Sequence, residues 1–391
     1  MKRFFKYASL LVAAVMLAAC DQTSTNTGEG LLTITSDKNL IQTFGGDYAA
    51  LTVTLDGAVV TEGVTFFNDD NEILDIVDFK FTAEEPGEYE IWANYGTYNS
   101  DKIAIRAISV AIPETPEDPQ PSNTKFVTRV LQTEFTTLGC TFCPNMKILL
   151  ETAYEDAAFA EKVVSVECHP GLINSIADQC YVHTTFDDFC KIGGYPTVNL
   201  DMCANFANYN LPASEFRAQV NQLISDKEAA TAGIAVNASY KDGHIVAKAT
   251  IKAAVAGNYR IGAFLLEDGV YGKQQGGLAE DWMDTHDGVV RYIDSRYIAK
   301  TGGERYNGYS VGTVSAGGTA DYVFTWDLEK IWADGTEKAQ INGGGKPWSE
   351  YVLENLHMAV FVSSVSEITG DYHVNNVIDC PINGVTKFEY R

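Results

Sequence analysis

The sequence predicts a multidomain α+β protein in which two mostly β domains flank a central α/β domain. Its 391 residues exceed what one hydrophobic core usually organises. Alternating runs near both ends are typical of strands, whereas an apolar run in the middle leads into a helical pattern. A hydrophobic content of 46% and an aromatic content of 11% indicate a globular chain. We expect these segments: 1–19 (signal peptide), 20–30 (tether), 31–111 (β domain), 112–124 (linker), 125–228 (α/β domain) and 229–391 (C-terminal β-sandwich domain).

The first twenty residues have the pattern of an export signal. A basic segment, 1–6, precedes the apolar run 10–17, which is too short to span a bilayer. The ending Leu-Ala-Ala-Cys resembles the lipobox of bacterial lipoproteins, which implies cleavage before Cys20 and lipidation of its thiol. Several acyl chains would hold the protein in a membrane, because each buried CH₂ contributes roughly 0.8 kcal/mol. The alternative is an ordinary secreted protein with an incidental cysteine.

The formal net charge of −24 limits the kinds of partner that the protein can bind. An acidic chain is repelled by nucleic acid and by anionic lipid head groups, so we expect neither as a partner. Removing the signal removes basic residues and no acidic ones, which makes the mature chain more acidic still. A soluble body held by its lipid fits this charge.

Residues 31–111 read as a small all-β domain. The runs 31–36 and 50–55 alternate between apolar and polar residues, and Asp56-Gly57 between two runs indicates a hairpin turn. The later runs 79–83, 89–95 and 102–108 resemble the last strands of an immunoglobulin-like β-sandwich. This segment contains no cysteine, so the resemblance lacks the inter-sheet disulfide.

The linker at 112–124 is rich in proline, with four prolines between residues 113 and 121. Such a composition favours an extended, semi-rigid spacer. We therefore expect it to hold the central domain away from the first domain, and so away from the membrane.

A Cys-x-x-Cys motif occupies the strand-to-helix junction of the central domain, at Cys140 and Cys143. The free N–H groups and the dipole of the helix that starts there would stabilise a thiolate on Cys140. Cys143 lies one turn further on and could resolve a mixed disulfide. The same spacing also serves structural disulfides and metal sites, so both alternatives stay open.

Pro196 supplies a second mark, because it enters a short apolar strand about fifty residues later, and proline in a strand often marks a cis peptide. Together the two marks resemble the thioredoxin-like superfamily over residues 125–228. The resemblance implies that Cys140 is the nucleophile, that Cys143 resolves, and that Pro196 lies against the disulfide. The sequence departs from the family at Gly139, where tryptophan is usual, and in the lack of a readable strand between residues 202 and 211.

Five further cysteines follow the motif. Because an exported chain lies where disulfides persist, we expect structural disulfides among them, although their connectivity cannot be read from sequence. Zinc is the alternative, because Cys168, Cys180, His183 and Cys190 are the right residue types, but their spacing is poor for a structural zinc site. We therefore expect no metal and no cofactor. The five cysteines are Cys168, Cys180, Cys190, Cys203 and Cys380.

Residues 229–391 again read as mostly β. A hairpin turn is indicated at Asp242-Gly243, and further strands at 259–266 and 356–362. A long Gly-rich excursion at roughly 272–320 contains His286 and Arg291, and a loop of that length is usually functional or disordered. We expect His286 to be a hydrogen-bonded structural group rather than a ligand.

The order of parts, with the motif His-x-x-Val-Val-Arg at 286–291, looks like the Omp-twenty-eight-related outer-membrane lipoproteins of Bacteroidota. This resemblance covers 125–391 and implies residence in the outer membrane or at the cell surface.

Two hypotheses for the function follow from these observations. The first is a membrane-anchored thiol–disulfide oxidoreductase that acts on exported proteins, which requires an exposed Cys140. The second is a non-catalytic surface protein that binds a partner and uses a disulfide-locked, thioredoxin-like scaffold.

Overall fold

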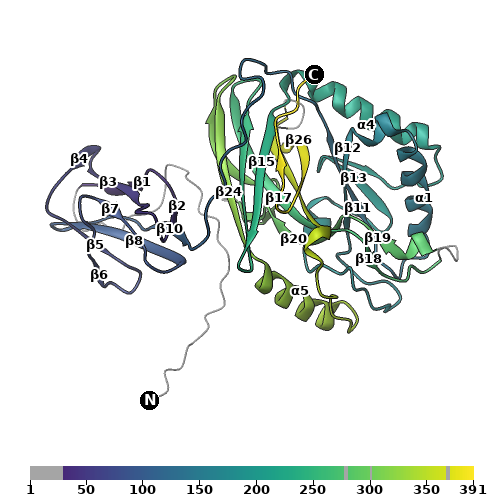
Figure 1. Ribbon diagram of the computed structural model, residues 1–391, viewed down its shortest axis with the longest axis horizontal. Coiled ribbons are helices and arrows are strands. Elements are labelled where there is room, and N and C mark those ends of the chain that lie inside the picture. Colours follow the sequence, from purple (N-terminus) through teal and green to yellow (C-terminus); the bar gives the residue numbers. More distant parts are fainter. Residues whose placement is uncertain (1–29, 277–280, 300–301, 367–369) are drawn as a thin grey trace. The chain divides into compact units, whose positions relative to one another are not determined.

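The computed structural model describes residues 30–276, 281–299, 302–366 and 370–391. Within them the chain is rich in β-sheet and divides after Ile112 into two compact units (Figure 1). The proposed lipidation site, Cys20, and nearly all of the tether lie outside the described residues. No helix in the described ranges is long and apolar enough to cross a membrane.

The first unit consists of strands that surround one apolar core. One sheet is centred on β3, which pairs antiparallel with β1, β4 and β7. The other is centred on β8 and β10, with β2 parallel to β10. Inward residues such as Ile34, Val53 and Ile91 are buried, as the alternation predicted. The strands of the unit are β1 (Leu32–Ser36), β2 (Leu40–Gln42), β3 (Ala49–Leu55), β4 (Ala58–Val60), β5 (Val64–Phe67), β6 (Ile73–Leu74), β7 (Lys80–Phe81), β8 (Gly87–Tyr95), β9 (Tyr98–Asn99) and β10 (Ile103–Ile108).

The second unit is built on one large mixed sheet, in the order β14-β13-β11-β12-β20-β17-β25-β26, with β23 also pairing with β17. The segments 125–228 and 229–391 were expected to be separate domains, but this sheet runs through both. The junction is the parallel pairing of β12 with β20, where Glu167 faces Val289. The strands are β11 (Val130–Phe135), β12 (Val163–Cys168), β13 (Thr197–Leu200), β14 (Ala204–Phe206), β17 (Gly257–Glu267), β20 (Val289–Asp294), β23 (Tyr309–Val314), β25 (Leu356–Val365) and β26 (Tyr372–Pro381).

Helices α1 (Cys143–Tyr154) and α4 (Ala213–Lys227) lie beside the β11–β13 end of this sheet (Figure 1). Their apolar faces meet β11 and β13 in a core that includes Val130, Met146 and Phe216. Pro144 lies in the first turn of α1, where its missing N–H costs no helical hydrogen bond. The shorter helices are α2 (Ala157–Ala160), α3 (Phe186–Phe189) and the 3-10 turns Glu228–Ala230, Asp281–Asp284 and Leu353–Asn355.

A second sheet, in the order β24-β16-β15-β27, packs on the β17–β25 part of the large sheet. Its buried residues include Val236 and Ile251, which share a core with Ile261 and Val360 of the large sheet and with α5 (Leu328–Asn342). Its strands and the two remaining ribbons are β15 (Gly233–Lys241), β16 (His244–Lys252), β24 (Thr319–Asp327), β27 (Val385–Thr386), β18 (Val270–Tyr271) with β19 (Thr285–His286), and β21 (Tyr297–Ile298) with β22 (Glu304–Arg305).

Among the strands that were missed from the sequence, β14 and β20 matter most for the site. β14 forms a hairpin with β13 in the stretch where no strand could be read, because Asp201 and Met202 adopt left-handed conformations (φ 53° and 59°) that reverse the chain at once. β20 lies in the excursion 272–320, which was expected to be a loop, yet it is an interior strand of the large sheet.

The proline-rich linker is not a free spacer, because residues 113–124 belong to the second unit. The ammonium group of Lys252, which is 2% exposed, binds the carboxylate of Asp118 (2.8 Å) and the carbonyls of Gln120 (3.3 Å) and Pro121 (2.7 Å). A buried ammonium group needs several oxygens to replace its water, and the linker supplies them. The extended segment is thereby fixed along β16.

His357 makes the stability of the second unit depend on pH. It lies on β25 and binds Asp268 (3.2 Å) and Asp379. Burial alone would lower its pKa, but these two hydrogen bonds raise the pKa of His357 to about 9. Because this exceeds the unfolded value of about 6.5, the stabilisation is complete below pH 6.5 and is lost as the pH rises through 9.

We expect His357→Gln to lower the free energy of unfolding by about 1–2 kcal/mol at pH 6 and by almost nothing at pH 10. Urea unfolding at both pH values measures this difference. His244→Gln is the control, since that exposed ring binds the carbonyl of its own turn residue Asp242. A loss that is equal at both pH values would show that packing, not charge, accounts for the role of His357.

Candidate functional site

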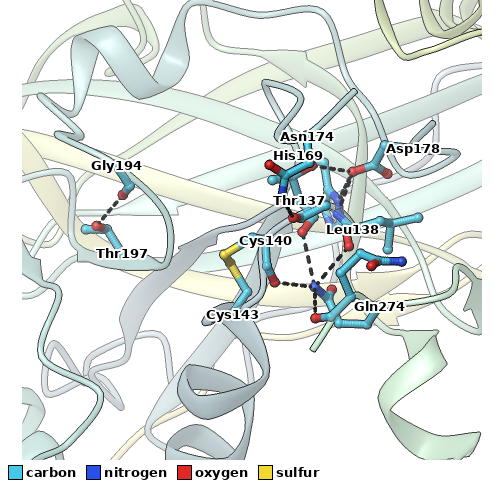
Figure 2. Close-up of a disulfide and its surroundings, with 12 residues drawn as sticks. Thr137, Leu138, Cys140, Cys143, His169, Asn174, Asp178, Gly194, Thr197 and Gln274 are labelled. Carbon is cyan, nitrogen blue, oxygen red and sulfur yellow. Dashed lines mark hydrogen bonds and ion pairs between the residues drawn. A yellow bond between two sulfur atoms is a disulfide. The ribbon is translucent and has the colours of Figure 1, made fainter. Parts of the chain in front are cut away.

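Cys140 and Cys143 form a disulfide at the junction of β11 and α1 (Figure 2). The two half-cystines are each 2% exposed, although Thr141 and Phe142 between them are exposed. An exposed Cys140 was a requirement of the oxidoreductase hypothesis, and the structure contradicts that expectation for the oxidised protein.

Gly139 is required by a close approach of the backbone. A Cβ atom at this position would lie 2.0 Å from the carbonyl oxygen of Ile173 and 3.2 Å from Cβ of Ile176. The carbonyl of Gly139 in turn accepts a hydrogen bond from Nδ2 of Asn174 (3.1 Å). The loop around residue 174 therefore occupies the space that the usual tryptophan would need, which accounts for this departure from the thioredoxin-like pattern.

Gln274, from the C-terminal half of the chain, ties down the loop that leads to the disulfide. Its Nε2 donates to the carbonyls of Thr137 (3.2 Å), Leu138 (3.3 Å) and Cys140 (2.9 Å) (Figure 2). The Thr137 carbonyl also accepts from the N–H of Cys140 (3.0 Å), so the amide of Gln274 reinforces a loop that is already hydrogen-bonded. This contact could not be predicted from the sequence, because Gln274 lies far along the chain from Cys140.

The next two residues complete a cover over the motif. The N–H of Gln275 donates to the carbonyl of Leu138 (2.8 Å). Gly276 has φ +73°, and a Cβ there would lie 2.4 Å from the carbonyl oxygen of Thr141. Segment 274–276 therefore packs directly on the disulfide loop and accounts for the burial of Cys140.

Pro196 enters β13, and the Tyr195–Pro196 peptide bond is cis, as predicted. Thr197 donates from Oγ1 to the carbonyl of Gly194 (2.7 Å; Figure 2), and the Tyr195 hydroxyl donates to Asp187 (3.0 Å). β13 lies beside β11, the strand that leads to Cys140. The two marks read from the sequence thus belong to neighbouring strands.

A buried acid, Glu134, lines a small cavity together with Cys143 of the disulfide. It lies on β11, whose six residues are all buried, and lines a cavity of about 10 Å³ together with Cys143, Lys147 and Glu167. That volume is about what one water molecule needs. Burial, and next the charge of Glu167, raise the pKa of Glu134 to about 8. Glu134 is therefore mainly protonated at neutral pH, and it shares this cavity with Cys143.

Two histidines and two carboxylates lie behind this cavity. His169 binds Glu167 through Nε2 (2.7 Å) and Asp178 through Nδ1 (2.8 Å). His286 binds the same Glu167 oxygen through Nδ1 and the carbonyl of Gly272 through Nε2 (3.1 Å). Burial alone would lower the pKa of His169, but Asp178 and then Glu167 raise it to about 10. His286 is thus a hydrogen-bonded group within a buried charged cluster.

Asp178 connects this cluster to the disulfide loop. The oxygen that binds His169 also accepts from the Thr137 hydroxyl (3.0 Å) and from the N–H of Leu138 (2.9 Å; Figure 2). Its other oxygen accepts from the N–H of Cys180 (2.8 Å). One buried carboxylate therefore fixes both the disulfide loop and the segment that carries Cys180.

The disulfides expected among the remaining cysteines are absent from the described residues, where all five thiols are free. An oxidising compartment permits disulfides, but two cysteines pair only where the fold brings their sulfur atoms together. In the structure Cys380 on β26 points at the carbonyls of Pro381 and Gly384 (3.6 Å each), and Cys203 at that of Leu200 (3.4 Å). The free cysteines are Cys168, Cys180, Cys190 and Cys380, all buried, and Cys203, which is exposed.

No known protein family matches the sequence, and no curated protein matches it. A comparison with solved structures finds HBP35 of Porphyromonas gingivalis, with a TM-score of 0.48 and 15% sequence identity. That match covers 67% of this chain and 77% of the other.

Proposed function

We propose that residues 125–228 form a thioredoxin-like module in which Cys140 and Cys143 exchange disulfides with exported proteins. Support comes from the β11–α1–β12 unit, the antiparallel β13 and β14, and the disulfide at the first strand-to-helix junction. The observation that carries the proposal is the buried, mainly protonated Glu134 in one cavity with Cys143. Perturbed buried acids beside a reactive group are typical of functional sites, and a purely structural disulfide does not need one.

The oxidised protein accepts electrons from a substrate dithiol. A substrate thiolate attacks Sγ of Cys140, the Cys140–Cys143 bond breaks, and a mixed disulfide forms with Cys140. The electron pair of the broken bond stays on Sγ of Cys143, which takes the proton of Glu134. The second substrate thiolate then displaces Cys140, so the substrate leaves as a disulfide. Cys140 and Glu134 regain protons from water, which leaves the protein as a dithiol.

Access to Cys140 requires movement of segment 274–276. The hydrogen bonds of Gln274 hold this segment over the loop, so a protein substrate reaches the sulfur only after they break. The cover would thereby restrict exchange to substrates that bind well enough to displace it.

A trapping experiment tests the proposal. Reduced Cys143→Ser protein that also carries Cys203→Ser, because Cys203 is exposed, is incubated with oxidised glutathione, and the intact mass is measured under native conditions. Cys140 attacks the disulfide, and without Cys143 the mixed disulfide persists, so we expect one glutathione adduct on Cys140. Cys140→Ser is the control that forms no such adduct at this position. A Cys143→Ser protein that reacts only after denaturation would refute exchange in the folded state.

The 2% exposure of Cys140 favours a second candidate, in which the disulfide is a permanent staple and the protein binds a surface partner. Under this alternative Cys140→Ser lowers stability and leaves partner binding unchanged. Binding that followed the redox state of the thiols would exclude it.

We also propose that Cys20 carries the lipid that anchors the chain in the outer membrane or at the cell surface. The support is the sequence pattern of residues 1–20 alone. Metabolic labelling with palmitate should mark the wild-type chain and not Cys20→Ser, and equal labelling of both would contradict the anchor.

A further inference from the structure

Three buried side chains with metal-binding atoms gather behind the disulfide cavity. One ring nitrogen each of His169 and His286 and the Sγ of Cys180 all lie within 4.8 Å of one another. The three residues are at most 1% exposed. They come from the end of β12, from the following loop and from β19, so the large sheet and its ribbon bring them together.

The outer nitrogen of each ring is already held by an acceptor. Nδ1 of His169 faces the carboxylate of Asp178 (2.8 Å), and Nε2 of His286 faces the carbonyl of Gly272 (3.1 Å). Each ring therefore carries a proton on its outer nitrogen. Metal-binding histidines are held in this way, because a carboxylate or carbonyl on the far nitrogen fixes the ring and makes the near nitrogen a better ligand.

The inner nitrogens both face one oxygen. Nε2 of His169 lies 2.7 Å from Oε1 of Glu167, and Nδ1 of His286 contacts the same atom. A carboxylate oxygen only accepts, so each inner nitrogen needs a proton as well, or a cation in place of the two protons. With two protons, both rings would be cationic in the interior, with ring centroids 5.5 Å apart. One bound cation removes that repulsion.

We propose that this cluster is a binding site for a divalent transition metal, of which zinc fits best. The ligands are Nε2 of His169, Nδ1 of His286 and Sγ of Cys180, with the Glu167 carboxylate as the fourth donor. Two imidazoles, a thiolate and a carboxylate are donors that zinc accepts in a four-coordinate site, and calcium and magnesium prefer oxygen alone.

The charges around the site suit a divalent ion. The thiolate of Cys180 and the carboxylate of Glu167 would face it, and the carboxylate of Asp178 would face the far nitrogen of His169. Arg291, a cation near Cys180, is already neutralised by Glu267 at 2.8 Å. A metal would also ionise the buried thiol of Cys180, since a coordinating thiol is deprotonated.

Cobalt is the probe, because its bond to a thiolate absorbs in the near ultraviolet whereas its bonds to nitrogen and oxygen alone do not. The protein is produced in medium supplemented with CoCl₂, so that the buried site fills during folding. Cys203→Ser serves as the background, because Cys203 is exposed, and the Cys140–Cys143 disulfide is kept oxidised. Metal content per chain and the absorption spectrum are then measured.

We expect one cobalt ion per chain and the thiolate-to-cobalt band. Cys180→Ser should lose the band and most of the metal, and Cys380→Ser, which removes another buried thiol, should keep both. Growth with ZnCl₂ should give the same stoichiometry without the band. Metal content in the background protein that equals that of Cys180→Ser overturns the proposal, as does a band that survives Cys180→Ser. Since the disulfide stays closed throughout, either result is independent of thiol exchange.

Discussion

Glu134→Gln protein is expected to exchange disulfides about 100-fold more slowly than the wild type. The glutamine has nearly the same shape but cannot give a proton to Cys143 as that sulfur leaves. A general acid in such a position commonly contributes a factor of about 10²–10⁴. Because Glu134 is mainly neutral at pH 7, its replacement by a neutral amide should leave the melting temperature unchanged or higher.

The rate of oxidation of a dithiol peptide under single-turnover conditions measures this effect. Glu151→Gln is the matched control, since it removes a carboxylate from the exposed side of α1. We expect the control to react at the wild-type rate. Equal rates for wild type and Glu134→Gln would exclude Glu134 as the proton donor, and a lowered melting temperature would assign it a structural role instead.

Arg291→Met is expected to lower the free energy of unfolding of the second unit by about 3–5 kcal/mol. Arg291 is 2% exposed, and its guanidinium group contacts one oxygen of Glu267 through Nε and Nη2, at 2.8 Å each. It also donates to the carbonyl of Gln179 (3.0 Å) and lies 4.6 Å from the ring centroid of Trp348. Methionine fills much of the volume but leaves the buried charge of Glu267 without a partner.

Urea unfolding of three variants separates charge from packing. Arg296→Met removes a partly exposed arginine that pairs with Glu304, and we expect it to cost less than about 1 kcal/mol. Arg291→Met combined with Glu267→Met removes both buried charges and should recover most of the loss. If the double variant were as unstable as Arg291→Met, lost packing on Trp348 rather than an unpaired charge would be the cause.

The disulfide could be predicted because its chemistry lies within four consecutive residues and a helix start. The cis peptide bond before Pro196 could be predicted for the same reason, because a proline that enters an apolar strand is visible in the local sequence. The residues behind the disulfide come from distant segments, as the 119 positions between Glu167 and His286 illustrate. Their contact depends on the pairing of β12 with β20. The strand β20 was not predicted, because it lies in a Gly-rich stretch that was interpreted as a loop.

Two strand carboxylates are a signal of the site that is present in the sequence. Glu134 and Glu167 each lie near the end of a stretch that was correctly predicted as a strand. A carboxylate in a buried strand is costly unless it is paired or protonated, so two of them indicate a functional interior. The prediction of further disulfides was wrong. It considered the oxidising compartment alone, without the positions that the strands impose on Cys168 and Cys380.

The equilibrium reduction potential of the Cys140/Cys143 pair tests the central claim most directly. The pair is titrated in the folded protein with glutathione or dithiothreitol buffers, with Cys140→Ser as the control. The account predicts a reversible couple between about −120 and −270 mV, the range of thioredoxin-fold enzymes. A potential below about −300 mV, or reduction only after unfolding, would mark a structural staple and contradict thiol exchange.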